Sequence, residues 1–142
     1  MVFILCGGLA VLLLAGALLG PAVIGARPFR DLTAGDIRSV QLELYPPDAG
    51  FTLTQEEVEE LVPLLNQIVV YQRDDSWRDY CGQLCRFTLT MADGSQTTVQ
   101  AYNPFLILDG VGWRTKYGPC EALNHFANIC NDHRRVIDAK DM

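Results

Sequence analysis

The first 26 residues constrain this chain most, because none of them carries a charged side chain. Met1 to Ala26 contains no Asp, Glu, Lys, Arg or His, and its apolar residues leave no polar stripe. Roughly 20 apolar residues in a helix span a hydrocarbon core of about 30 Å. A helix that lacks a polar face is unsuited to the surface of a globular domain. The segment therefore predicts either a transmembrane helix or a signal segment cut after Ala22 or Ala26.

The rest of the chain, residues 27–142, has the length of one ordinary domain. All 11 basic and all 17 acidic residues lie in it, and they give a net charge of −6. The basic residues are scattered rather than clustered into a stripe. Because binding to nucleic acid or to anionic lipid needs such a basic surface, we expect neither as a partner of the domain.

Two signals give opposite orientations of this domain. Arg27 and Arg30 follow the apolar segment, and the positive-inside rule would place a domain behind them in the cytoplasm. An even number of cysteines in a small domain behind an export segment instead favours disulfides and an oxidising compartment. We give the cysteine signal more weight than the arginine signal. We therefore expect a domain outside the cytoplasm, tethered in the cell membrane or secreted after cleavage. The four cysteines concerned are Cys81, Cys85, Cys120 and Cys130.

Two helices are predicted. Thr54 and Glu57 form a capping box, and apolar residues then recur with helical spacing along residues 58–69. A second helix begins at Gly118-Pro119, since proline is favoured in the first turn, and runs to about Cys130.

Alternating apolar residues predict the strands, and two Asp-Gly pairs predict hairpin turns between them. The predicted strands cover residues 37–45, 69–71, 85–91, 97–102, 105–108 and 111–116. Together these elements predict an α+β domain of two layers, an antiparallel sheet with two helices. The predicted organisation is a membrane or signal segment (1–26), a linker (27–35), the α+β domain (36–131) and a charged tail (132–142).

Geometry limits the disulfide pairings. In one helix, Cys120 and Cys130 would lie about 15 Å apart along the axis. The Cα atoms of a disulfide lie within about 7 Å, so these two cysteines do not pair with each other. Cys85 shares strand parity with the apolar residues after it, and Cys130 shares a helix face with Leu123. We therefore predict Cys85–Cys130 together with Cys81–Cys120.

The sequence contains no recognisable catalytic motif. It has no G-x-S-x-G, no H-E-x-x-H and no glycine-rich phosphate loop. The cysteine spacings are C-x3-C and C-x9-C, unlike the paired knuckles of zinc sites, and His125 is expected on a helix surface. We expect no catalytic residue, no metal site and no cofactor. The alternative is a thiol or zinc-dependent enzyme that uses the cysteine group.

The polar segment 72–82 contains the best candidates for contact with a partner. Trp77 and Tyr80 are amphipathic aromatics in this polar loop, whereas Trp113 is expected in the core. The neighbouring Asp74, Asp75 and Asp79 are expected to be solvated.

Residues 36–130 resemble small membrane-anchored or exported proteins of Gram-positive bacteria. The resemblance is carried by TQEEVEELVPLLNQIVVY (54–71), by Tyr80 and Gly82, by FTLTMADGS (87–95) and by LILDG (106–110). It implies an extracytoplasmic sensor or accessory module and carries over no catalytic residue. We therefore expect a non-catalytic binding or accessory domain, held at the membrane through residues 1–26, that binds a protein, a peptide or an envelope ligand.

Overall fold

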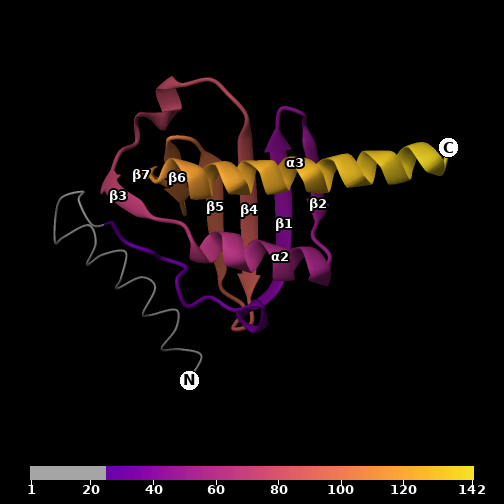
Figure 1. The fold of residues 1–142 in the computed structure, drawn as a ribbon, viewed down its shortest axis with the longest axis horizontal. Helices are drawn as coiled ribbons and strands as arrows, with labels where there is room; N and C mark the ends of the chain where they lie inside the picture. Colours follow the sequence, from indigo (N-terminus) through magenta and orange to yellow (C-terminus); the bar gives the residue numbers. More distant parts are fainter. Residues whose placement is uncertain (1–24) are drawn as a thin grey trace.

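The computed structural model describes residues 25–142 and shows an α+β fold with one antiparallel sheet (Figure 1). The sheet has seven strands in the order β2-β1-β4-β5-β6-β7-β3, so β2 and β3 form its edges. The elements are η1 (Ala34–Asp36), β1 (Ile37–Tyr45), β2 (Ala49–Thr52), α2 (Gln55–Asn66), β3 (Val70–Arg73), η2 (Ser76–Asp79), β4 (Leu84–Met91), β5 (Gln96–Tyr102), β6 (Phe105–Leu108), β7 (Val111–Thr115) and α3 (Tyr117–Lys140). The predicted α+β class and antiparallel sheet with two helices are confirmed.

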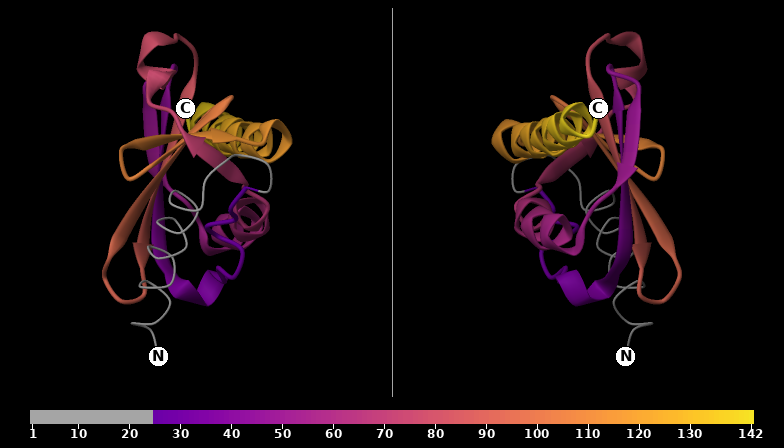
Figure 2. Two further views of the ribbon diagram at one scale, coloured as in Figure 1. Left: turned by 90° about the vertical axis from the view of Figure 1, so that its left-hand side faces the viewer. Right: turned by 90° about the vertical axis from the view of Figure 1, so that its right-hand side faces the viewer.

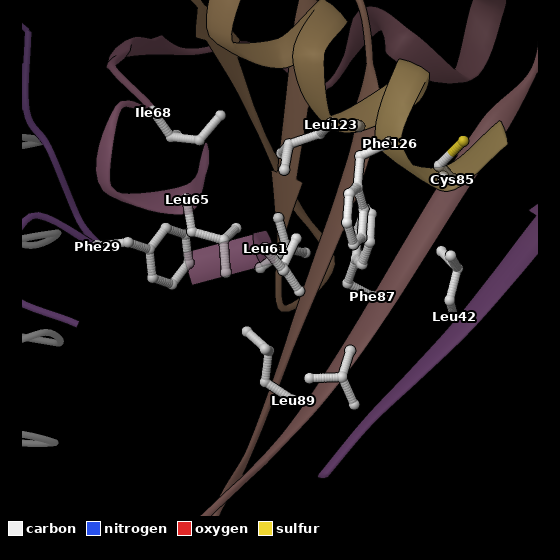
Figure 3. Close-up of a cluster of buried hydrophobic side chains, with 14 of the residues drawn as sticks. Phe29, Leu42, Leu61, Leu65, Ile68, Cys85, Phe87, Leu89, Leu123 and Phe126 are labelled. Atoms are coloured by element: carbon white, nitrogen blue, oxygen red, sulfur yellow. The ribbon is translucent and has the colours of Figure 1, made fainter. Parts of the chain in front are cut away.

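Both α-helices cover the same face of the sheet (Figure 2). The strands place one set of alternate residues on that face; in β4 these are Cys85, Phe87 and Leu89, at most 1% exposed. Phe87 lies 6.3 Å from Phe126 of α3, measured between ring centroids. Figure 3 shows the same side chains facing the two helices, with Leu61 and Leu65 of α2 and Leu123 of α3. The core therefore lies between one face of the sheet and the two helices.

Helix α2 begins as the capping box predicts. The Glu57 backbone N–H donates to Thr54 Oγ1 at 3.2 Å, and the Thr54 N–H donates to Glu57 Oε1 at 2.8 Å. Glu57 also forms a bidentate ion pair with Arg134 of α3. Arg134 Nη2 lies 2.6 Å from Glu57 Oε1, and Arg134 Nη1 lies 2.8 Å from Glu57 Oε2. The same guanidinium donates to the Thr52 carbonyl at 3.1 Å and lies over the Phe51 ring. Arg134 therefore joins α3 to the start of α2 and to the edge strand β2.

Two segments differ from their sequence-based descriptions. Residues 132–142 were predicted as a charged tail, but α3 continues to Lys140 and extends past β2 (Figure 1). Residues 27–35 were predicted as a linker, but Phe29 is only 2% exposed and lies in the core. The linker prediction failed because a single buried aromatic leaves no periodic pattern. Strand β2 was not predicted, since its four residues include glycine and alternate too briefly.

The predicted transmembrane or signal segment lies outside the described residues, apart from Gly25 and Ala26. Within residues 25–142, no helix is long and apolar enough to cross a membrane.

The Glu57–Arg134 pair predicts a specific acid sensitivity. Hydrogen bonding from Arg134 lowers the pKa of Glu57 from 4.5 to about 2. A lowered folded-state pKa adds stability above the ordinary pKa, and this stability is lost as pH falls from 4.5 toward 2. Glu57→Gln should therefore lower the free energy of unfolding at neutral pH and flatten its loss in this acid range.

Denaturant unfolding at a series of pH values measures this effect. Glu59→Gln, which removes an exposed glutamate from the same helix, is the control and should keep the wild-type slope. A Glu57→Gln protein whose stability falls as steeply as the wild type would contradict the prediction.

Candidate functional site

One face of the sheet lies away from both helices, and we call it the open face (Figure 2). It carries mainly uncharged polar side chains. The residues that alternate with the core positions of β1, β4 and β5 lie here, and most of them are half-buried or exposed. They include Ser39, Gln41, Thr88, Thr90, Gln96 and Thr98. One end of the open face is apolar instead.

At that end, an apolar row crosses four strands. Tyr45 of β1 is opposite Leu84 of β4, and Tyr102 of β5 is opposite Phe105 of β6. Leu84 packs against the buried cluster that contains Tyr102 and Phe105, so the two pairs form one row. Directly opposed residues of antiparallel strands point to the same face, and this row therefore lies on the open face. We call Tyr45, Leu84, Tyr102 and Phe105 the aromatic row.

Residues 74–81 cover part of this row. Hydrogen bonds to two carboxylates of this loop hold it against β7. The Gly112 N–H donates to Asp75 Oδ1 at 2.8 Å, and Arg114 Nε donates to Asp74 Oδ2 at 2.8 Å. The Asp74 N–H donates to the Gly112 carbonyl at 2.9 Å, and the Ser76 N–H donates to Asp74 Oδ1 at 2.9 Å. The expectation that these aspartates are merely solvated is wrong for Asp74 and Asp75, because both fix the loop.

The electrostatics of the loop agree with this role. Hydrogen bonds from Ser76, followed by Arg114, lower the pKa of Asp74 to about 2. The hydrogen bond from the Gly112 backbone is the main cause that lowers the pKa of Asp75. Both carboxylates are therefore ionised at neutral pH and act as hydrogen-bond acceptors, rather than as acid–base catalysts.

The two aromatic candidates in the loop have different surroundings. Trp77 packs on the aromatic-row cluster, and its buried Nε1 has no hydrogen-bond partner among residues 25–142. Tyr80 is 57% exposed and stacks on Phe105 with ring centroids 5.4 Å apart. The loop thus uses Trp77 mainly for packing and presents Tyr80 to solvent. Trp113 is 8% exposed and lies in the core, as predicted.

The structure adds two residues to this surface that the sequence analysis missed. Tyr45 is 39% exposed at the other end of the aromatic row, and Arg86 lies over its ring at 5.8 Å. Arg86 also pairs with Glu43 at 3.2 Å, directly across the strands. Strand parity was the available signal, since Tyr45 alternates with the core residues Leu42 and Leu44. We call Tyr45, Tyr80, Leu84 and Arg86 the tyrosine patch.

All four predicted disulfide cysteines are free thiols in the structure. Cys85, Cys120 and Cys130 are buried, and Cys81 is exposed. The core-facing positions predicted for Cys85 and Cys130 are confirmed, and the single helix α3 keeps Cys120 apart from Cys130. The Cys85–Cys130 bridge is not formed here and stays a prediction.

The predicted Cys81–Cys120 bridge is likewise not formed here and stays a prediction. Gly82, beside Cys81, lies against the ring of Tyr102 on the open face. Cys120 belongs to the core on the helix side, where its Sγ lies 3.6 Å from the Phe105 carbonyl oxygen.

The buried thiols are poorly suited to catalysis or metal binding. Burial raises the pKa of Cys85, of Cys120 and of Cys130 to about 12 each. At neutral pH they are protonated, whereas the thiolate is the nucleophile and the metal ligand. Among the described residues, no three His, Cys, Asp or Glu side chains are grouped to hold a metal ion. His125 lies exposed on α3, as predicted.

A groove of about 620 Å³ lies between the β1–β2 hairpin and the second half of α3. Arg134, Arg135 and Asp138 contribute its charged side chains, and its lining contains neither cysteine nor histidine. The groove offers charge and surface, but no nucleophile paired with a base.

No protein-family model, curated protein or solved structure matches this chain. The function is therefore proposed from the surface described above.

The close fit of the loop to β7 predicts the effect of one added methyl group. A Cβ at Gly112 would collide with the Asp74 carbonyl and with the Trp77 indole. Gly112→Ala should lower the free energy of unfolding by about 1–3 kcal/mol, as overpacking typically does, and should loosen the loop that presents Tyr80. Gly118→Ala, where nothing lies within 4 Å, is the matched control. Equal stability and equal protease resistance of residues 74–81 in both variants would contradict this packing.

Thiol accessibility gives a second prediction, for the folded protein isolated from its native host. A maleimide should label Cys81 before unfolding and should label Cys85, Cys120 and Cys130 only afterwards, because these three are buried. Mass spectrometry of peptides covering residues 81–130 reads both steps. Early labelling of a buried cysteine would contradict the fold. If Cys85 and Cys130 take up label only after reduction, the predicted bridge exists instead and the domain has passed through an oxidising compartment.

Proposed function

We propose that this protein is a membrane-tethered binding or accessory domain outside the cytoplasm, which binds a partner protein through the tyrosine patch and performs no catalysis. The single observation that carries the proposal is the exposure of Tyr80 and Tyr45, at 57% and 39%, on rigidly held backbone. Tyrosine and arginine are enriched among the residues that dominate the energy of protein interfaces.

Rigidity supports a binding role for this patch. Tyr80 lies on a loop that Asp74 and Asp75 fix to β7, and Tyr45 and Arg86 lie on neighbouring strands of the sheet. Side chains held in place before binding lose less conformational freedom on association, so more of their contact energy contributes to affinity. The flat polar surface beside the patch provides the hydrogen-bonding rim that such interfaces have.

The sequence supports both the membrane tether and the orientation of the domain. The uncharged N-terminal segment is long enough to span a bilayer, and the even set of four cysteines in a small domain favours the exported side. Arg27 is a weaker signal of orientation than the positive-inside rule suggests. Its guanidinium donates to the Asn66 carbonyl at 2.8 Å, at the end of α2, where a cation stabilises the helix dipole.

The alternative, a thiol or zinc-dependent enzyme, has less support. Three of its four cysteines are buried thiols whose pKa values lie near 12, and the fourth, Cys81, is exposed. No observation on the described residues favours this class over binding.

Site-specific photo-crosslinking in the native host tests the proposal. A photoreactive amino acid at position 80 should crosslink the full-length protein to one distinct protein partner. The same amino acid at Gln96, exposed at the polar end of the open face, is the control and should give no such product. Tyr45→Ala should weaken the product formed from position 80, because both residues contact the same partner. Identical product patterns at positions 80 and 96 would refute the tyrosine patch as the binding surface.

A further inference from the structure

The uncharged segment runs directly into the folded domain. Its last two residues, Gly25 and Ala26, already belong to the fold. The Ala26 and Val70 backbones exchange two hydrogen bonds of 2.8 Å each, which adds Ala26 to the outer side of the edge strand β3. A Cβ at Gly25 would collide with Val69 and approach Tyr71 closely. The chain is thus held to the sheet at the point where its apolar run ends.

The next residues are also fixed. Asn66 Nδ2 donates to the Phe29 carbonyl at 2.6 Å and to the Leu32 carbonyl at 3.0 Å. Phe29 itself lies in the core. From Gly25 onward the chain is therefore part of the fold, and the β3 edge is the side of the domain at which the uncharged segment joins it.

The basic residues are scattered along the sequence, but the fold brings three exposed ones to this junction, which the expectation of no surface for anionic lipid did not foresee. Val70 has Ala26 on one side and Thr115 on the other, so Ala26 and Thr115 lie two strand spacings apart, about 10 Å. Arg27 follows Ala26, Lys116 follows Thr115, and both side chains are exposed. Arg30 is exposed as well, and Tyr117 is 65% exposed at the first position of α3. The guanidinium of Arg27 donates to the Asn66 carbonyl, so Arg30 and Lys116 provide the cations of this surface. We call Arg30, Lys116 and Tyr117 the anchor-side surface.

The opposite end of the domain is richer in acids. Helices α2 and α3 run in opposite directions, so the start of α2 and the end of α3 lie away from β3 (Figure 1). Four glutamates occupy the first turns of α2, and Asp138 and Asp141 lie at the end of α3. Near the anchor-side surface, the chain carries Asp31 and also Glu121, which accepts from Asn103 at 3.1 Å. The charge distribution therefore changes along the long axis of the domain.

We propose that the anchor-side surface rests on the anionic phospholipid headgroups of the membrane that holds the N-terminal segment. The cations attract the anionic headgroups, Tyr117 lies at the depth where amphipathic aromatics gather, and the glutamates of α2 are kept away from the surface. The domain then stands on its β3 edge, with β2 and the end of α3 farthest from the bilayer. This inference rests on the membrane tether of the proposed function.

Fluorescence quenching in liposomes tests the orientation with the full-length chain. A fluorophore is attached at Tyr117→Cys or, as the distal control, at Asp141→Cys, each with Cys6→Ser and Cys81→Ser. The vesicles carry a headgroup-attached quencher in phosphatidylcholine, with or without phosphatidylglycerol. We expect quenching at position 117 that increases with phosphatidylglycerol, and little quenching at position 141.

Charge variants test whether the cations of the anchor-side surface cause the increase in quenching with phosphatidylglycerol. Arg30→Gln with Lys116→Gln should remove the increase caused by phosphatidylglycerol, whereas Arg135→Gln with Lys140→Gln, at the distal end, should preserve it. Flotation with the vesicles is measured on every sample. Protein that floats but shows equal quenching at positions 117 and 141, or no response to anionic lipid, overturns this inference alone. Protein that does not float overturns the membrane tether and this inference with it.

Discussion

The structure depends on the burial of only one face of its sheet. Strand residues alternate between the two faces, so the apolar set of β1, β4 and β5 points at the helices and the polar set points away. Helices α2 and α3 close the apolar face, and Arg134 joins them through Glu57. The same alternation leaves the other face uncovered except where residues 74–81 cross it. Both the core and the candidate binding surface therefore follow from one parity rule.

Local patterns in the sequence were enough to predict the main elements. The capping box at Thr54, the alternation before and after Asp93-Gly94, and the second Asp-Gly pair each specify structure within a few residues. The missed parts depend on contacts between distant residues. The end of α3 reads as charged and fraying, yet Arg134 fixes it to Glu57, which is 77 residues away. Likewise, nothing local to Asp74 predicts its bond to Arg114.

The candidate site was predictable only in part. Tyr80 was singled out because it lies in a polar loop, and the structure exposes it. Trp77 came from the same reasoning, yet it packs against the aromatic row, because Gly112 leaves room for its indole. Tyr45 was missed although its parity was readable, because a strand end followed by two prolines is most simply interpreted as a turn. Pairing across strands, which brings Tyr45 beside Leu84, is not a local property of the sequence.

The proposed membrane contact and the proposed partner contact lie on different sides of the domain. Ala26, at the end of the uncharged segment, pairs with the β3 edge, and the tyrosine patch lies on the open face of the sheet. A sheet that stands on its edge at a membrane leaves both of its faces accessible from the side. The buried cysteines fill the core on the covered face, so they take no part in that contact.

The most direct test of a membrane-tethered domain outside the cytoplasm is labelling on intact cells of the native host. A cysteine introduced at Asp141, on the exposed end of the domain, is treated with a membrane-impermeant maleimide before the cells are lysed and fractionated. Labelled protein of full length is expected in the membrane fraction, with no increase in labelling after lysis. Protein that is labelled only after lysis would contradict it.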